Sequence, residues 1–239
     1  MINEVRNTVL AILNKQNYGY VSPADFNLYA KQAQLDIFEQ YFYKYNRGII
    51  MENARQSNTG LADMTKRTQE VIETFCPPIT ALIASAPTNS FLLPDDIFHL
   101  NNLRYLISAG RFIDIEKTNR SKINQLLMSN LTQPIEVFPM YYSEGKKVVV
   151  YPETISGVNK VFADYVRYPL DPRWTWRNIS GGTPVFDPTQ EDYMDFELPL
   201  SDQTLLVAKI LQYAGFEIRE DAAVQSGSIE EQKTTQLQN

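Results

Sequence analysis

The chain of 239 residues contains one histidine, His99, and one cysteine, Cys76. Two such side chains cannot supply the three or four ligands of a usual zinc site, so the sequence excludes that kind of metal centre. A single cysteine also excludes a disulfide within the chain, which suits a reducing compartment. We interpret Cys76, which precedes two prolines at a predicted helix end, as a small buried hydrophobic residue.

Motifs of the common catalytic machineries are missing as well. No serine lies in a Gly-x-Ser-x-Gly sequence, and the stretch SGGT at 180–183 has neither the lysine nor the spacing of a phosphate-binding loop. Asp95 and Asp96 belong to no calcium loop, and the sequence LPDD favours a turn there. His99 is interpreted as a structural residue at the start of a strand. We therefore predict no catalytic residue, no cofactor and no bound metal.

A long apolar run is also lacking, since no stretch approaches the roughly 18–20 apolar residues of a membrane-spanning helix. The N-terminal sequence MINEVRNTVLAILNKQNYGY has no small-residue cleavage site of the kind that ends a signal peptide. We therefore expect no association with a membrane.

The charge is acidic and unevenly distributed. The net charge of −6 and the pI of about 5.0 argue against a free, strongly basic nucleic-acid binder. Residues 182–239 hold eleven acids and three bases, a net charge of −8, whereas residues 1–181 hold 17 acids and 19 bases, a net charge of +2. Such a division favours complementary surfaces in an oligomer or a surface that repels passing DNA, and a solvated acidic tail explains it equally well.

Apolar periodicity predicts helices at both ends of the sequence. The first covers the N-terminal residues up to about Gly19, and the second runs from about residue 23 to 45, after the start signal SPAD. Asn46-Arg47-Gly48 is expected to end it. Further helices are predicted at about 61–75 and 201–214. Apolar and aromatic residues cover more than one face of the second helix, so we expect it to contact more than one neighbour, in the core or in another subunit.

The middle of the chain has the pattern of β-strands. Extended segments are expected at 91–94, 99–106, 111–116 and 158–168, and the sequence SEG at 143–145 predicts a hairpin between two further strands. A short helix is expected at 119–130. Residues 171–196 show no regular pattern, which is uncommon for so long a stretch inside a compact domain.

These patterns predict an α+β fold. A helical bundle would comprise residues 1–85 and 198–222, and an antiparallel sheet domain of four or five strands with a long irregular excursion would comprise residues 86–197. Residues 223–239 would form a polar C-terminal tail.

Aromatic residues in two regions are candidates for contacts with other subunits or partners. Arginines alternate with tryptophans in the excursion, an arrangement that suits single-stranded nucleic acid or a protein interface. We favour a protein interface because no basic domain surrounds these residues. The candidate interface residues are Phe26, Ile37, Tyr41 and Tyr45 of the second helix, and Arg173, Trp174, Trp176 and Arg177 of the excursion.

Seven short segments follow one another in a distinctive order. They are SPADF at 22–26, AKQAQLDIF at 30–38, LPDDI at 93–97, YVRYP at 165–169, PRW at 172–174, FELP at 196–199 and KILQYAG at 209–215. In this order they resemble the head–tail connector or ring proteins of tailed bacteriophages, over residues of about 20–215. The resemblance is closest to crAss-like phages with short tails and more distant to the tail tubular protein A class of adaptors.

The resemblance implies a virion structural protein of the neck or tail region that is not an enzyme and is assembled in the host cytoplasm. Such adaptors form a homo-oligomeric ring, commonly of about twelve copies, beneath the portal protein. They join the portal to neighbouring neck or tail proteins, and genomic DNA passes through the bore without specific binding. The long excursion at 171–196 departs from the distant adaptor class.

Two alternatives remain at the level of the sequence. One is another virion component, such as a stopper or tail-hub protein. The other is a small hydrolase that uses carboxylates, for example Asp95, Asp96 and Asp164, because two carboxylates at a suitable separation are sufficient for hydrolysis.

Overall fold

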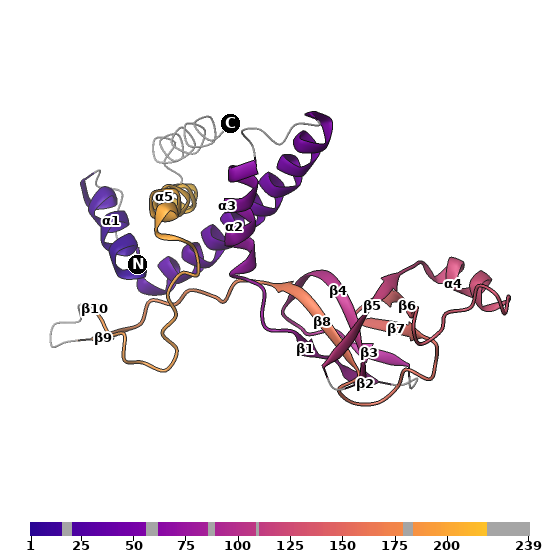
Figure 1. The fold of residues 1–239 in the computed structure, drawn as a ribbon. Helices are drawn as coiled ribbons and strands as arrows, with labels where there is room; N and C mark the ends of the chain where they lie inside the picture. Colours follow the sequence, from indigo (N-terminus) through magenta and orange to yellow (C-terminus); the bar gives the residue numbers. More distant parts are fainter. Residues whose placement is uncertain (16–20, 56–61, 86–88, 109, 179–183, 219–239) are drawn as a thin grey trace. The chain divides into compact units, whose positions relative to one another are not determined.

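A computed structural model of the chain describes residues 1–15, 21–55, 62–85, 89–108, 110–178 and 184–218 (Figure 1). It contains both helices and a large sheet, so the predicted α+β class is confirmed. The chain forms two compact units, which we call the helical unit (residues 1–72 and the chain from residue 169 onward) and the sheet unit (residues 73–168).

The predicted domain boundaries differ from these units in two places. Residues 73–85, predicted as part of the bundle, belong to the sheet unit because they contain the first two strands. Residues 169–197, predicted as part of the sheet domain, belong to the helical unit because they hydrogen-bond to its helices. The predicted tail at 223–239 lies outside the described residues.

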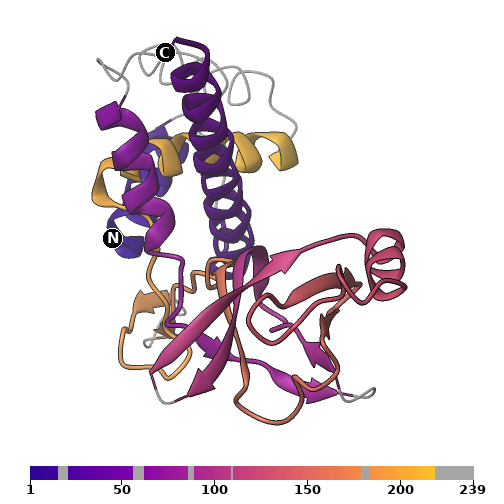
Figure 2. The ribbon, with the colours of Figure 1, turned by 45° about the vertical axis from the view of Figure 1, so that its right-hand side comes forward.

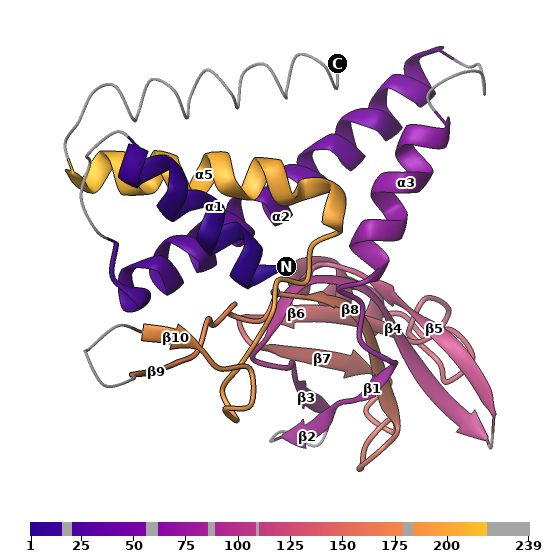
Figure 3. The same ribbon diagram turned by 90° about the vertical axis from the view of Figure 1, so that its left-hand side faces the viewer.

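The helical unit is built from helices at both ends of the chain, with α5 packed against α1 and α2 (Figure 3). Its apolar core includes Val5 and Val9 of α1, Phe26 and Ile37 of α2 and Leu206 of α5, all buried. The helices are α1 (Ile2–Lys15), α2 (Pro23–Arg55), α3 (Ala62–Glu73), the short 3-10 helix η1 (Leu200–Asp202) and α5 (Gln203–Ile218).

The second helix is longer than predicted. Asn46, Arg47 and Gly48 lie inside α2, so the predicted end at residue 45 is wrong. One glycine in a helix interior costs only about 1 kcal/mol relative to alanine, which the hydrogen bonds of the following turns offset. Gly215 is likewise inside α5.

The described residues of the sheet unit form eight strands rather than the four or five predicted, in the order β1-β8-β4-β5-β6-β7-β3-β2. All neighbouring pairs are antiparallel except β5 and β6, which are parallel because the helix α4 (Arg120–Leu127) and a loop connect them. The strands are β1 (Thr80–Ala81), β2 (Ile83–Ser85), β3 (Ser90–Leu92), β4 (Ile97–Ser108), β5 (Arg111–Lys117), β6 (Met140–Glu144), β7 (Lys147–Tyr151) and β8 (Val161–Arg167).

The sheet closes on itself through a single segment. Its first and last strands, β1 and β2, are separated in sequence only by Leu82. The Leu82 N–H donates to the carbonyl of Val161 on β8, at 2.8 Å, while β2 pairs with β3. One continuous chain therefore joins both ends of the sheet and encloses an apolar interior. That core contains Leu82, Phe91, Leu103, Tyr105, Ile115, Tyr141, Val148, Val150, Ile155, Val161, Ala163 and Tyr165.

The predicted hairpin and short helix are confirmed. Strands β6 and β7 pair in antiparallel register around Gly145, whose φ of +61° is a conformation that favours glycine. The helix α4 packs on the outer face of these two strands through Ile123, which contacts Tyr142 and Val149.

Residues 169–198, which we call the strap, are tied to α2 by two amide side chains. Asn27 accepts a hydrogen bond from the Trp174 N–H (2.9 Å) and donates one to the Trp174 carbonyl (3.1 Å). Gln34, which is buried, donates to the Leu170 carbonyl (2.7 Å) and accepts from the Glu197 N–H (3.0 Å). The strap is thus less irregular than predicted, and it includes a hairpin of β9 (Trp176–Asn178) and β10 (Pro184–Phe186).

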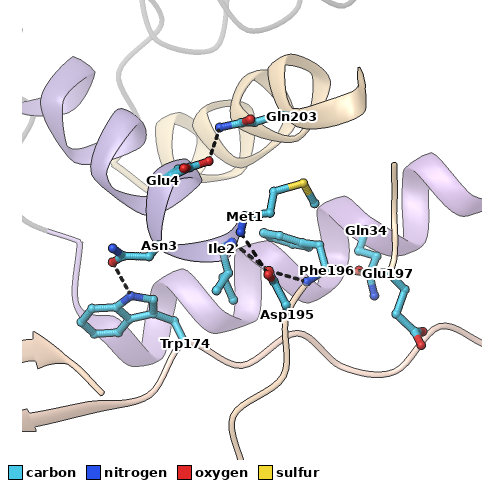
Figure 4. Close-up of polar contacts among 10 residues, drawn as sticks. All are labelled: Met1, Ile2, Asn3, Glu4, Gln34, Trp174, Asp195, Phe196, Glu197 and Gln203. Carbon is cyan, nitrogen blue, oxygen red and sulfur yellow. Dashed lines mark hydrogen bonds and ion pairs between the residues drawn. The ribbon is translucent and has the colours of Figure 1, made fainter. Parts of the chain in front are cut away.

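The strap also holds the beginning of α1 (Figure 4). The Asp195 carboxylate accepts hydrogen bonds from the α-amino group of Met1 (3.0 Å), from Ile2 N–H (2.8 Å) and from Phe196 N–H (2.8 Å). A carboxylate at this position pairs with the free N–H groups and the positive end of the helix dipole. The indole N–H of Trp174 donates to Asn3 Oδ1, at 3.1 Å.

None of the described helices is both long enough and apolar enough to cross a membrane.

From these contacts we predict that two glutamines of α2 contribute very differently to the free energy of unfolding. Gln34→Ala leaves the Leu170 carbonyl and the Glu197 N–H without these partners, so we expect a loss of about 1–3 kcal/mol in the free energy of unfolding. Gln32→Ala, on the exposed side of the same helix, should change it by no more than about 0.5 kcal/mol. Urea unfolding measures both, and equal losses would show that Gln34 does not hold the strap.

The buried tyrosines of the sheet core lead us to predict that the fold loses stability at alkaline pH. Burial raises the pKa of Tyr105, Tyr141 and Tyr165 above the ordinary value of 10.0. The folded chain then binds more protons than the unfolded chain above about pH 10, so the free energy of unfolding should fall as the pH rises through that range and be unaffected below it. Urea titrations over a pH series measure this fall, and it should be shallower in Tyr141→Phe.

Candidate interface surfaces

Three of the predicted interface residues belong to the core of the helical unit. Phe26, Ile37 and Trp174 are each 1% exposed, so the prediction that they contact another subunit is wrong. Phe26 and Ile37 lie on the buried side of α2. Trp174 is covered within the strap by the stacked rings of Trp176 and Phe186, with centroids at 6.0 and 5.8 Å.

The guanidinium of Arg6 covers Trp174 as well, with its central carbon 3.8 Å from the centroid of the indole ring. Arg6 is itself buried, and the sequence analysis did not identify it, because it considered only the arginines of the excursion. It joins α1 to the strap instead of serving a partner.

The other predicted residues keep some exposed surface. Tyr41 and Tyr45 are half-buried, and the Tyr41 hydroxyl donates to Asp202 at 2.5 Å, which joins α2 to η1. Burial, reinforced by the Asp202 carboxylate, raises the pKa of the Tyr41 phenol, so it stays protonated in this contact. Trp176 is half-buried, and Arg173 and Arg177 are exposed, with Arg173 paired to Asp192 at 2.8 Å. These five positions remain candidates.

A second surface lies on the side of α2 opposite to its core face. Leu28, Leu35, Tyr43 and Ile50 are separated by seven or eight residues, which places them within an arc of roughly 80° at 100° per residue. We call these four residues the α2 stripe. Three of them are exposed, by about two thirds of their surface, and Leu35 is half-buried. The sequence contained this signal as the apolar residues that widened the face of the helix.

The sheet unit carries a larger exposed apolar surface. We call residues 127–138, which begin at the last residue of α4 and lie at the periphery of the unit, the apolar loop (Figures 1 and 2). Met128 is 87% exposed and Leu131 is 97% exposed, and the other exposed apolar side chains of the loop are Leu127, Ile135, Val137 and Phe138. The sequence analysis did not identify this loop, because its apolar residues follow neither a helical nor a strand period.

Hydrogen bonds within the apolar loop fix its conformation. The N–H groups of Thr132 and Gln133 donate to the Ser129 carbonyl at 3.2 and 3.0 Å. Phe138 N–H donates to the Ile135 carbonyl at 3.0 Å, and the Thr132 hydroxyl donates to the Leu126 carbonyl at 3.2 Å. The loop therefore presents its apolar side chains from a backbone that is already ordered, which lowers the entropic cost of binding.

The apolar area of this loop is at the upper end of what a monomer exposes in one patch. Its six exposed side chains present on the order of 600 Å², taking about 150–200 Å² for each fully exposed large side chain. The largest apolar patch of a typical monomer covers about 300–600 Å² and often serves a function. The loop is therefore the best candidate for an interaction site in the sheet unit.

The three aspartates considered for hydrolysis have different partners. Asp95 is exposed and pairs with Lys146 at 2.8 Å, and this hydrogen bond lowers the pKa of its carboxyl group. Asp96 accepts a hydrogen bond from the Tyr165 hydroxyl at 3.2 Å, and Asp164 lies on β8 opposite Asn102. The two neighbouring carboxylates, Asp95 and Asp96, are therefore engaged by different groups, a lysine and a tyrosine hydroxyl.

His99 lies near the start of strand β4, opposite Val166 of β8. Its side chain is exposed, so it is not part of the apolar core. Within the part of the chain that the structure describes, no three His, Cys, Asp or Glu side chains form a group that could hold a metal ion.

Comparisons of the sequence with known protein families and with curated proteins found no match.

Two variants compare how much the apolar loop and the helix α4 contribute to the stability of the sheet unit. Leu131→Ser combined with Phe138→Ser should leave the free energy of unfolding within about 0.5 kcal/mol of the parent, because both side chains are exposed. Ile123→Ala, which opens a cavity under α4, should cost about 2–4 kcal/mol. Urea unfolding tests both. A large loss in the double variant would show that the loop stabilises the fold rather than serving a partner.

Proposed function

We propose that this chain is a virion structural protein, the ring or adaptor subunit of a bacteriophage head–tail connector. Copies of the chain would form a closed ring, of about twelve subunits as in the proteins it resembles, between the portal protein and the tail. The chain would contribute to the channel through which genomic DNA passes. The observation that carries the proposal is the apolar loop, an ordered and exposed apolar surface that calls for a protein partner.

The α2 stripe supports the same conclusion from the other unit. A subunit of a ring with more than two members presents one surface to the neighbour on one side and a different surface to the neighbour on the other. The stripe and the loop are unlike in structure and belong to different units, so this chain has two surfaces of the kind that a ring requires.

The acidic charge of the C-terminal part suits a DNA channel. In the described part of the strap, Glu191 and Asp192 are exposed, and Asp187 is half-buried. Carboxylates that line a bore repel the phosphates of duplex DNA, so that the duplex moves without binding. We propose that the exposed carboxylates of the acidic part of the sequence, Glu191 and Asp192 among them, face the bore. A reconstruction of the assembled particle with these residues on its outer surface would refute this part of the proposal.

Assembly tests the proposed function. We expect the purified chain, alone at high concentration or after addition of the portal protein, to form a species of more than two copies, as measured by light scattering and native mass spectrometry. Mass spectrometry of purified virions should detect the chain at a copy number equal to that of its ring.

A chain that stays monomeric with the portal and is missing from virions would contradict the proposal. A chain that is present in virions at a position away from the portal would instead identify a stopper or tail-hub protein.

A further inference from the structure

We infer that the apolar loop of one copy packs on the α2 stripe of the next copy. The lateral contact of the assembly would thus join the sheet unit of one subunit to the helical unit of its neighbour. This inference rests on the proposed function and specifies which surfaces make the ring.

A ring of more than two copies requires a contact between two different surfaces, and the pairing of loop with stripe meets this requirement. A contact between two loops, or between two stripes, is the same patch on both partners, and such a contact ends at two copies. A contact between loop and stripe leaves one free loop and one free stripe on every pair. Further copies can therefore add until the ring closes.

The two surfaces also carry little charge. Glu136 is the only charged residue among residues 127–138 of the apolar loop. The residues that lie between those of the α2 stripe on the same side of the helix are Gln32, Glu39 and Asn46, of which only Glu39 is charged. Burying the loop on the stripe therefore removes few ions from water, and desolvation opposes the contact only weakly.

The combined area reaches what a specific contact needs. The loop presents on the order of 600 Å² and the stripe roughly 400 Å², taking about 150–200 Å² for each fully exposed large side chain. Their sum of about 1,000 Å² meets the lower limit of specific protein interfaces. Two stripes together would offer only about 800 Å², which is typical of crystal packing. An anionic lipid surface is a poorer occupant of the loop, because residues 123–135 contain no lysine or arginine.

A mixing experiment tests the pairing directly. The loop variant carries Leu131→Asp and Phe138→Asp, and the stripe variant carries Leu28→Asp and Tyr43→Asp. All four side chains are exposed, so the fold should persist, which circular dichroism and urea unfolding verify. Alone, each variant should associate with itself at least about 30-fold more weakly than the parent. Mixed in equal amounts, the two should form a dimer of one copy of each and nothing larger, because only one intact loop and one intact stripe meet.

Cysteine pairs provide a second measurement that does not depend on the strength of self-association. In a Cys76→Ser background, chains with Leu131→Cys are mixed with chains that carry Tyr43→Cys and treated with a short bismaleimide. We expect a crosslinked dimer in the mixture and far less in either chain alone.

A matched control for the aspartate variants of the loop and the stripe carries Ile83→Asp and Val158→Asp. These substitutions alter exposed apolar residues elsewhere in the sheet unit, so this variant should associate with itself as strongly as the parent.

Several outcomes would overturn the inference. Efficient crosslinking of Leu131→Cys chains with each other would show a contact between two loops. A third chain that carries both Leu131→Cys and Tyr43→Cys serves as a further control, and a crosslink within this chain at high dilution would show that its own loop covers its stripe. Flotation of the parent with phosphatidylserine vesicles that the loop variant loses, with no change in self-association, would show a lipid contact. If virions contain a ring of this chain but the mixture gives no mixed dimer, the pairing is wrong while the proposed function stands. If the mixed dimer forms but virions lack the chain, the proposed function is wrong while the pairing of loop and stripe stands.

Discussion

The helical unit depends on the hydrogen bonds that hold the strap against α1 and α2. Its helices come from both ends of the chain, and the whole sheet unit is inserted between them. Asp195, Asn27 and Gln34 connect the returning chain to helices that lie more than a hundred residues earlier in the sequence. These side chains satisfy backbone N–H and carbonyl groups that are partly buried, so removing one of them leaves a polar group without its partner at a cost in stability.

These contacts also decide which side of α2 remains available. The strap and α5 cover the side that carries Phe26 and Ile37, so the α2 stripe on the opposite side stays exposed. In the sheet unit, closure through Leu82 fills the interior with its own side chains. A closed sheet has few free edges for a partner strand, so the apolar loop outside it is the surface left for binding.

The proposed assembly uses the two apolar surfaces that remain exposed, the α2 stripe and the apolar loop. Burying about 1,000 Å² of mostly apolar surface yields a gross gain of roughly 25 kcal/mol, of which immobilisation of the subunits and side chains consumes a large part. A single contact of this size is therefore modest, while a closed ring adds a contact without immobilising a further subunit. This difference fits a chain that is separate at low concentration and assembles cooperatively once several copies meet.

Local patterns in the sequence determined the α+β class, the start of α2 at Pro23, the β6–β7 hairpin around Gly145 and the short helix α4. Each of these depends on neighbouring residues, through turn chemistry, capping and apolar period. Tertiary structure alone decided that Trp174 is buried, that α2 continues past Gly48 and that Leu82 closes the sheet. Periodicity shows which residues share a face, but contacts between distant segments decide which face is covered. For that reason three of the predicted interface residues lie in the core, and the apolar loop, which has no period, became visible only in the folded chain.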